Sequence, residues 1–396
     1  MNIMQKTMLS ALQYNEANSY RGYTLFTPLG SKNIYLVDMK GKVVHSWNLP
    51  FRTGSHGELL PNGNLLYAAK VPRAPLADFD GTTGILLEMD WSDSVVWQYE
   101  DRYMHHDFCR LPNGNTMLLR WVSTPEEIAH KVQGGLPNTE KEGIIWSDSL
   151  QEINPAGEIV WEWLSYEHLD PEIDTICPLC YRNKWPHINS FTVTTDGDIL
   201  ISCMKTNRIA VISKDTGEIK WRWGGFLKLG HPHDVCWSDS ENIVIFSSGG
   251  HLAGFEQCNS EVLWINMGTD DMVREYREPY GLQFFAPCQG GLQQLPNGNL
   301  LVTEGDTGRI FELTDNQDIV WEFVNPFYHP SPIYGRNNMV FRAYRYGFDY
   351  RGLKGNEAMS DKFQALSKEI DKTQGKKTYT PKGEKALQDR LTSLGY

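Results

Sequence analysis

Three segments of this chain repeat the same short phrase. SHGELLPNGNLLY (55–67), HDFCRLPNGNTMLL (106–119) and QGGLQQLPNGNLLVT (289–303) each place an Asn-Gly turn between two short runs of residues. Two weaker copies begin at His187 and His233. Because such turns need residues that tolerate a positive φ, each copy predicts a tight β-hairpin. A hairpin that recurs along the chain restricts the fold to an array of similar units.

A second phrase follows each hairpin and reads as a strand, a polar turn and a strand that ends in tryptophan. These tryptophans recur every 43 to 64 residues. A period of this length, with four short strands in each unit, is typical of a β-propeller. We count six units and predict an all-β fold, a six-bladed β-propeller of four-stranded blades. The marker residues are Trp47, Trp97, Trp161, Trp221, Trp264 and Trp321.

The two ends of the repeat region predict how the ring closes. The first unit (23–47) lacks its innermost strand, and MVFRAYRYGFDY from Met339 is strand-like but has no partner. We therefore expect residues 339–346 to supply the inner strand of the first blade, which removes a free sheet edge. The predicted organisation is an N-terminal extension (1–20), a propeller catalytic domain (21–350) and a helical or disordered C-terminal tail (351–396).

Charge and hydropathy restrict the partners. The net charge is −12, which argues against a protein that holds nucleic acid or an anionic membrane. The sequence has no apolar run long enough to cross a membrane, and its first 22 residues do not resemble a secretory signal. We therefore expect a cytoplasmic protein with reduced thiols. Cys177 and Cys180 have CxxC spacing without a second ligand pair nearby, so we expect them to pack the loop before His187, with a structural zinc as the alternative.

The long connections of the predicted blades all fall on one face of the disc, at 71–83, 122–146, 164–186 and 268–288. Functional residues usually lie on loops held by a rigid scaffold. Four histidines stand near the start of an inner strand on that face, which indicates a site at the channel mouth. Counting back from each turn puts His106, His187, Asn189 and His233 on one strand face and His56 on the other. Gln289 occupies the corresponding place in the last hairpin.

These phrases resemble the arylsulfotransferase family, six-bladed propellers that move a sulfuryl group between phenols. The resemblance covers most of residues 20–350. It is carried by the LPNGN hairpins, by GEIVWEW and GEIKWRWGG, by HIN at 187–189, by HD at 106–107 and 233–234, and by FRAYRY at 341–346. It implies that a channel histidine becomes sulfated, and by position His233 resembles this nucleophile. His106 and His187 resemble its acid–base companions, and Asn189 resembles the family asparagine.

One residue departs from the family pattern. The family arginine is replaced by the pair Met204 and Lys205, and lysine keeps the charge but loses the bidentate fork. Arg342 or Arg345 is the candidate substitute. The expected substrate-binding residues are Asn189, Lys205, Gln289, Arg342 and Arg345, acting on a small aromatic or anionic molecule. The expected reaction needs no cofactor, because a neutral imidazole can attack sulfur and leave again.

Two other functions remain open from the sequence alone. Four imidazoles that converge on one axis suit a transition metal ion, which would support a lyase, hydrolase or oxygenase. The ligands would then be His56, His106, His187 and His233. Alternatively, the ring is an interaction platform without catalysis, because a propeller fold does not by itself determine function.

Overall fold

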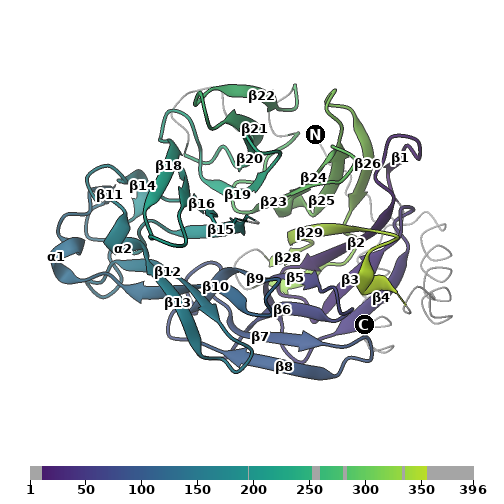
Figure 1. Ribbon diagram of the computed structural model, residues 1–396, viewed down its shortest axis with the longest axis horizontal. Coiled ribbons are helices and arrows are strands. Elements are labelled where there is room, and N and C mark those ends of the chain that lie inside the picture. The colour runs from purple at the N-terminus through teal and green to yellow at the C-terminus, as the bar shows by residue number, and fades with distance from the viewer. Residues whose placement is uncertain (1–10, 195, 252–258, 280–282, 332–334, 355–396) are drawn as a thin grey trace.

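Five four-stranded antiparallel sheets and one five-stranded antiparallel sheet surround a common axis in the computed structural model (Figure 1). The structure describes residues 11–194, 196–251, 259–279, 283–331 and 335–354. The predicted all-β, six-bladed propeller is confirmed. Within the described ranges, no helix is long and apolar enough to cross a membrane. The predicted C-terminal tail lies, from residue 355 onward, outside the described residues.

The first three blades, numbered from the N-terminus, contain strands in the order given from the axis outward. Blade 1 consists of β29 (Val340–Gly347), β2 (Gly22–Pro28), β3 (Asn33–Val37) and β4 (Val43–Asn48). Blade 2 consists of β5 (Thr53–Leu59), β6 (Leu65–Lys70), β7 (Gly84–Met89) and β8 (Val95–Glu100). Blade 3 consists of β9 (Met104–Arg110), β10 (Thr116–Ser123), β12 (Trp146–Ile153) and β13 (Ile159–Leu164).

The other three blades follow the same plan. Blade 4 consists of β15 (Ile188–Val193), β16 (Ile199–Cys203), β17 (Arg208–Ile212) and β18 (Ile219–Gly224). Blade 5 consists of β19 (Pro232–Trp237), β20 (Asn242–Ser247), β21 (Glu261–Asn266) and β22 (Met272–Tyr276). Blade 6 consists of β23 (Gly290–Gln294), β24 (Leu300–Glu304), β25 (Arg309–Leu313) and β26 (Ile319–Val324).

Most of the remaining elements lie in the connections between these strands, and the last 3-10 turn follows β29. They are the helices α1 (Glu126–Ala129) and α2 (Ser165–His168), the 3-10 turns η1 (Gly305–Thr307) and η2 (Arg351–Leu353), the parallel pair β11 (Gly134–Leu136) and β14 (Ile176–Tyr181), and the hairpin β27 (His329–Ser331) and β28 (Gly335–Asn337). The pairing of β11 with β14 joins two of the predicted long connections, 122–146 and 164–186, to each other.

Both ends of the described chain close the ring. β29 pairs with β2, with Tyr346 opposite Tyr23, so the predicted closure is confirmed. The N-terminal segment adds a second closure that the sequence did not reveal. β1 (Gln13–Tyr14) pairs with β26 at the outer edge of blade 6. Part of the expected extension therefore belongs to the propeller. β1 covers part of the outer edge of β26, the fourth strand of blade 6.

The marker tryptophans join each blade to the next. Five of them lie on outer strands, and each donates its indole N–H to the outer turn of the following blade. The pairs are Trp47 with Asp90, Trp97 with Pro155, Trp161 with Lys214, Trp221 with Asp270 and Trp321 with Met39. This contact is the physical reason for a tryptophan at the same place in each repeat, because the indole fills the gap between two sheets while its N–H satisfies a turn acceptor.

Blade 5 departs from the predicted pattern. Trp264 lies on β21, the third strand from the axis, rather than on the outer strand. The outer strand is β22, which falls within the expected loop 268–288 and carries no tryptophan. The prediction was wrong here because Arg274 occupies the place on β22 that tryptophan takes on the other outer strands.

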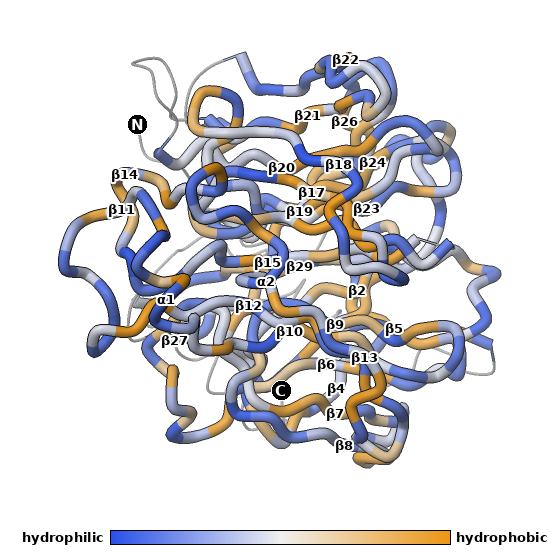
Figure 2. Tube along the Cα trace, turned by 60° about the vertical axis from the view of Figure 1, so that its left-hand side comes forward, coloured by the Kyte–Doolittle hydropathy of each residue, from blue (hydrophilic) through white to orange (hydrophobic). Residues whose placement is uncertain are grey.

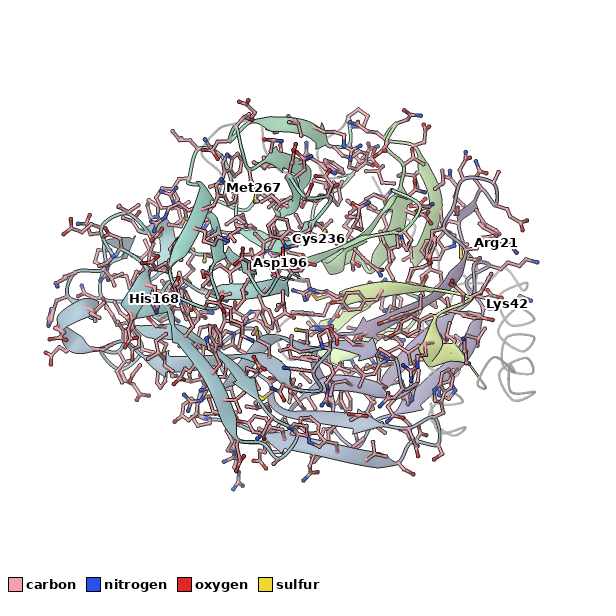
Figure 3. All side chains as sticks on the ribbon, viewed as in Figure 1. Arg21, Lys42, His168, Asp196, Cys236 and Met267 are labelled. Carbon is pink, nitrogen blue, oxygen red and sulfur yellow. The ribbon has the colours of Figure 1, made fainter. Side chains whose placement is uncertain are left out.

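The core lies between neighbouring blades. One cluster unites Ile34 and Trp47 of blade 1 with Tyr67 and Leu87 of blade 2. Apolar residues (orange) concentrate along the strands, whereas the outer connections are largely polar (Figure 2). Cys236 of the inner strand β19 lies near the centre of the disc and Lys42 lies at its rim (Figure 3).

Candidate active site

The inner strands that carry histidine are interrupted by β-bulges near the channel mouth. β9, β15 and β19 shift register against their second strands, and His106, Asn189 and His233 lie within the shifts. β5 shifts in the same way around His56. A bulge adds an unpaired residue and redirects the side chains next to it. Counting residues back from each turn therefore does not by itself decide which side chains share a face.

His106 and His187 meet at the channel mouth, as the sequence analysis expected. Their Nε2 atoms lie 3.4 Å apart and both side chains are buried. Both residues have left-handed backbones, with φ values of 49° and 66°. The His106 ring lies against Gly81, where an added Cβ would come within 2.1 Å of the imidazole. Only glycine fits at this position, because its φ of +71° also disfavours any side chain.

Asp80 and Lys184 complete this pair, although the sequence analysis did not single them out. The Oδ2 atom of Asp80 lies 3.6 Å from Nε2 of His187, and Oδ1 accepts a hydrogen bond from Nζ of Lys184. The ammonium of Lys184 also lies 5.1 Å from the centre of the Phe79 ring. The one signal in the sequence was that both residues lie in long connections on the expected face.

A row of buried groups extends behind His106. Nδ1 of His105 lies 2.9 Å from Nδ1 of His106, and Nε2 of His105 lies 3.3 Å from Oδ1 of Asp148. Asp148 in turn accepts a hydrogen bond from the backbone N–H of His187 at 2.9 Å. The His105 ring stacks on Trp121, with centroids 3.7 Å apart. This network fixes the orientation of both channel-mouth histidines.

Burial sets the protonation states in this network. Desolvation lowers the pKa of His106 to about 3 and holds the pKa of His187 well below its usual value, with the charge of Lys184 acting in the same direction. Desolvation also raises the pKa of the Asp148 carboxyl to about 8. At neutral pH both imidazoles are therefore uncharged and each has one nitrogen lone pair.

His233 stands apart from this pair but at the same mouth of the channel. Its Nδ1 lies 2.9 Å from the carbonyl oxygen of His231 and 2.6 Å from Oγ of Ser248. Because a carbonyl oxygen only accepts, Nδ1 carries the proton and Nε2 carries the lone pair. The side chain is half-buried, and no residue in the described ranges forms a hydrogen bond with Nε2. Burial, with the neighbouring His231, lowers the pKa of His233 to about 4.

Arg342 lies on the axis and holds two carboxylates. Its guanidinium contacts Asp107 at 2.9 Å and Asp234 at 3.3 Å, and all three side chains are buried. Each aspartate also accepts the backbone N–H of an inner strand in the following blade, Asp107 from Phe191 and Asp234 from Leu292. The aspartates of the two HD pairs therefore join blades together, and Arg342 balances their charge.

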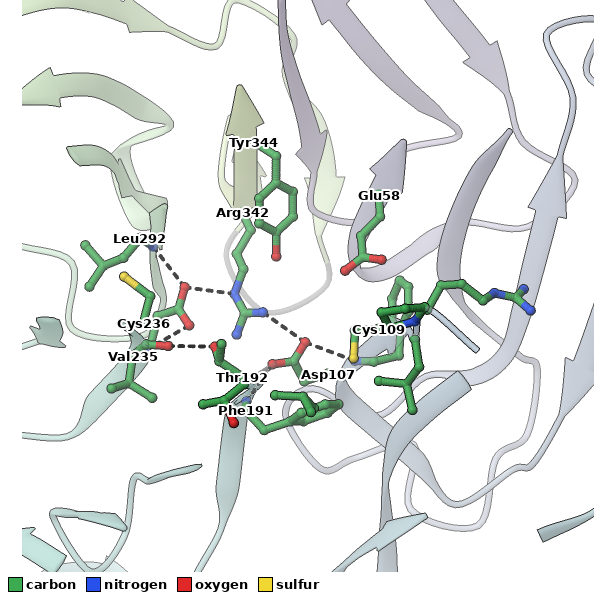
Figure 4. Close-up of a pocket in the computed structure, with 17 residues that line it drawn as sticks. Glu58, Asp107, Cys109, Phe191, Thr192, Val235, Cys236, Leu292, Arg342 and Tyr344 are labelled. Atoms are coloured by element: carbon green, nitrogen blue, oxygen red, sulfur yellow. Dashed lines mark hydrogen bonds and ion pairs between the residues drawn. The ribbon is translucent and has the colours of Figure 1, made fainter. Parts of the chain in front are cut away.

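This ion-pair group borders a cavity of about 350 Å³ in the channel (Figure 4). Glu58, Tyr344 and Cys109 line it together with Arg342. The cavity also follows β9 as far as Leu111 and Pro112, next to the Asn-Gly turn of blade 3. It therefore extends toward the turn-bearing face of the disc, on the other side of the Arg342 layer from the histidines.

Asn189 and Lys205, two other expected binding residues on the loop-bearing face, already have protein partners. Asn189 donates its amide N–H to the carbonyl of Pro232 at 2.8 Å. Nζ of Lys205 donates to Asn183 Oδ1 at 2.6 Å and to the carbonyl oxygen of Tyr181. Burial, with the neighbouring charge of Lys184, lowers the pKa of Lys205 to about 7. Gln289 is buried, and its Nε2 has no hydrogen-bond partner among the described residues.

Two sequence candidates lie outside the histidine group. Arg345 points between blades 1 and 6, where it pairs with Glu312 at 2.7 Å and covers the Trp321 ring. The expectation that Arg345 substitutes for the family arginine in the channel is therefore wrong. Its side chain leaves the channel because residues 342 and 345 on β29 face opposite sides of the sheet. His56 stacks on Phe108, with centroids 4.3 Å apart, and is buried.

The expected ring of four histidine ligands does not form a single ligand group. Among the described residues, the ligand atoms of Asp80, His106 and His187 lie within 4.8 Å of one another, without His56 or His233. The His56 ring stacks on Phe108, and the His233 ring is oriented by its hydrogen bond to the His231 carbonyl, so neither imidazole belongs to this ligand group. Two imidazoles and one carboxylate are a donor set that a transition metal ion accepts.

Comparison with known proteins gives a sequence match to one family. The sequence profile of the family described as arylsulfotransferase (ASST) matches residues 59–326. No curated protein matches the chain. This match covers about two thirds of the chain and includes the histidines at 106, 187 and 233.

Comparison with solved structures gives matches at low sequence identity. A Bacteroides caccae protein of unknown function has a TM-score of 0.52 and 12% identity, over 82% of this chain and 98% of its own. A streptogramin B lyase has a TM-score of 0.44 and 11% identity, over 79% of this chain and 86% of its own. The first similarity supports the propeller fold alone.

Proposed function

Because the chain belongs to the arylsulfotransferase family, we propose that it is an enzyme that moves a sulfuryl group between phenolic small molecules through a channel histidine. His233 is the proposed nucleophile. His106 and His187 are its proposed acid–base partners. The proposal includes the expected cytoplasmic location and a substrate that is a small aromatic sulfate ester.

The observation that carries the proposal is the hydrogen bond between Nδ1 of His233 and the carbonyl oxygen of His231. It fixes the tautomer in which the Nε2 lone pair is available for attack. It also stabilises the positive charge that develops on the ring as Nε2 forms a new bond, because the carbonyl dipole points its negative end at Nδ1–H. No such orientation is given to His56, whose ring is stacked between aromatic side chains.

The proposed reaction has two balanced steps. In the first, the Nε2 lone pair forms a bond to sulfur, the bond from sulfur to the aryl oxygen breaks, and the phenolate leaves with that electron pair and takes up a proton. In the second, an acceptor phenol loses its proton, its oxygen attacks sulfur, and the bond to Nε2 breaks. The charge on the equatorial oxygens resembles that in phosphoryl transfer, so positioned cations lower the barrier.

We assign the main cationic role to Lys184 rather than to Lys205. Two of the three N–H groups of Lys205 are used by Tyr181 and Asn183, whereas Nζ of Lys184 donates to Asp80 alone among the described residues. Lys184 also lies at the channel-mouth group, where its charge acts on His187. His106 and His187 then exchange the proton with the leaving or entering phenol.

The test is incubation with 4-nitrophenyl sulfate. We expect a burst of one equivalent of nitrophenol per chain and a mass gain of about 80 Da, one SO₃ group, on the peptide that contains His233. His233→Ala abolishes both. The matched control is His130→Ala, since His130 is exposed and distant from the channel, and it keeps both signals. A burst that persists in His233→Ala, or a mass gain on another residue, contradicts this assignment.

A second candidate function is metal-dependent catalysis at the channel mouth. It is favoured by the convergence of Asp80, His106 and His187 within 4.8 Å. Metal analysis of the His106→Ala/His187→Ala double variant separates the two functions. A stoichiometric metal ion in the native protein that is absent from this variant, together with no mass gain from any aryl sulfate, supports the metal-dependent reaction and contradicts sulfuryl transfer.

A further inference from the structure

Four ligating side chains from three connections converge beside the channel. Cys177 and Cys180 lie on β14, His231 directly precedes β19, and His251 follows β20. Their sulfur and nitrogen atoms all lie within 4.8 Å of one another. Cys177, Cys180 and His231 are buried, and His251 closes the group from the exposed side. This group is separate from Asp80, His106 and His187, and the proposed sulfuryl transfer does not use it.

The distances match those of a tetrahedral zinc site. With Zn–S bonds of about 2.3 Å and Zn–N bonds of about 2.0 Å, neighbouring sulfur and nitrogen ligands lie about 3.5 Å apart. Here, Nδ1 of His251 lies 3.6 Å from both sulfur atoms, and Nε2 of His231 lies 3.3 Å from the sulfur of Cys180. The arrangement thus leaves space for one ion at the centre of four atoms.

The surroundings of the group hold its ligands in place. Both cysteines are free thiols rather than a disulfide. The backbone N–H of Cys177 donates to the carbonyl of Lys205 at 2.7 Å, and that of His231 donates to Oδ1 of Asn207 at 2.8 Å. Partners of this kind orient metal ligands before the ion binds. Two cysteines and two histidines without a further open position are the ligand set of a structural zinc site.

We propose that Cys177, Cys180, His231 and His251 bind one Zn²⁺ ion in a closed tetrahedral site. Binding releases the two thiol protons, so that two thiolates and two neutral imidazoles surround the ion. The ion joins the connection between blades 3 and 4, the connection between blades 4 and 5, and the connection between β20 and β21. The metal links these three connections on the loop-bearing face.

Metal analysis of the full-length protein tests the proposal. We expect one zinc per chain after purification without chelator, and none in the Cys177→Ser/Cys180→Ser double variant. Cys288→Ser is the matched control, because Cys288 is exposed and outside the group, and it keeps its zinc. His251→Ala weakens zinc binding at least about tenfold, whereas His251→Cys retains the ion.

Cobalt(II) gives a readout that does not depend on catalysis. Replacement of zinc by cobalt in the native chain should give the intense visible absorption of a tetrahedral thiolate site, and His251→Cys should strengthen its sulfur-to-metal band. This result holds whether or not sulfuryl transfer is correct, so the two proposals fail separately.

Three results overturn the zinc proposal. The first is a native chain that neither purifies with zinc nor binds cobalt. The second is a chain about 2 Da lighter, with Cys177 and Cys180 joined in a disulfide, which would make them a redox pair. The third is a metal that stays in the Cys177→Ser/Cys180→Ser variant and is lost only when His106 and His187 are replaced.

Discussion

The carbonyl oxygen of His231 accepts a hydrogen bond from Nδ1 of His233 at 2.9 Å, although the two imidazoles serve different groups. The His231 ring points to the sulfur of Cys180, and the His233 ring lies at the channel mouth. One short segment at the start of β19 therefore belongs to both the proposed zinc site and the proposed nucleophile. Anything that moves the His231 backbone also moves His233.

This relationship predicts that zinc removal slows sulfuryl transfer. Without the ion, the His231 backbone is held less firmly, and a displacement of about 1 Å at a reacting group can cost about 10²-fold in rate. We expect the nitrophenol burst of zinc-free protein to be at least about tenfold slower, measured by stopped-flow absorbance, and to recover when zinc is added back. An unchanged burst rate in zinc-free protein would show that the two sites are independent.

Arg342 should be essential for stability. Replacing it by glutamine leaves the buried carboxylates of Asp107 and Asp234 without their cation, and loss of one partner from a buried ion pair costs about 3–5 kcal/mol. Urea unfolding of Arg342→Gln should show a loss of this size. Glu16→Gln is the control, because the Arg21–Glu16 pair is exposed and should contribute less than about 1 kcal/mol. Equal effects of the two substitutions contradict the role given to Arg342.

Glu58 should make the protein less stable as the pH rises. Its surroundings, which include His56, Arg110, Arg342 and Tyr346, leave it largely buried, and desolvation raises its pKa from 4.5 to about 7. Below pH 4.5 the carboxyl is protonated in both the folded and unfolded chain, so it has no effect there. Between pH 4.5 and 7 only the unfolded chain loses the proton, which lowers the free energy of unfolding by up to about 3 kcal/mol.

The Glu58→Gln variant isolates this effect. The free energy of unfolding, measured in urea, should fall less between pH 5 and pH 8 for the variant than for the native chain. Relative to the native chain, the variant is therefore more stable at pH 8 than at pH 5. Other buried acids, such as Asp234, whose pKa burial raises to about 6, act equally in both proteins and cancel in the comparison. The same pH slope in both chains would contradict the raised pKa.

Ring closure should decide whether the chain folds. A chain that stops at residue 335 lacks β29, the inner strand that pairs with β2, and exposes a sheet edge on blade 1. We expect it to lose cooperative thermal unfolding by circular dichroism. The control stops at residue 354, keeps all the described strands and should melt close to the native temperature. Cooperative unfolding of the shorter chain at an unchanged temperature would contradict closure by β29.

The sequence alone was sufficient for the architecture, because the propeller is built from local repeats. Each Asn-Gly turn needs a positive φ, and Gly63, Gly114 and Gly298 have φ values of 93°, 88° and 89°. The missing strand at one end of the repeats and the unpartnered strand at the other predicted the closure between β2 and β29. The pairing of β1 with blade 6 and the outer strand of blade 5 were not predicted, since neither carries the repeated residues.

The candidate site could be predicted only in part. Repeat position located the histidines at the channel mouth, and His106 and His187 do meet there. Lys184 and Asp80 were missed, because their loops contain no repeated phrase. His105 on β9 was missed because it lies one residue before the repeated phrase. Arg342 and Arg345 are three residues apart, yet the first holds the channel carboxylates and the second an ion pair between blades.

The strands, the number of blades and the level of the channel at which the histidines stand follow from the amino-acid sequence, because turn conformation and strand periodicity are local properties. The tertiary structure decided which side chains meet. Bulges in the inner strands redirect His106 and His233, and folding brings His231 and His251 to the cysteine pair that lies 51 or more residues earlier in the chain. Distances across a closed ring depend on packing between blades, and the spacing of residues along the chain does not predict that packing.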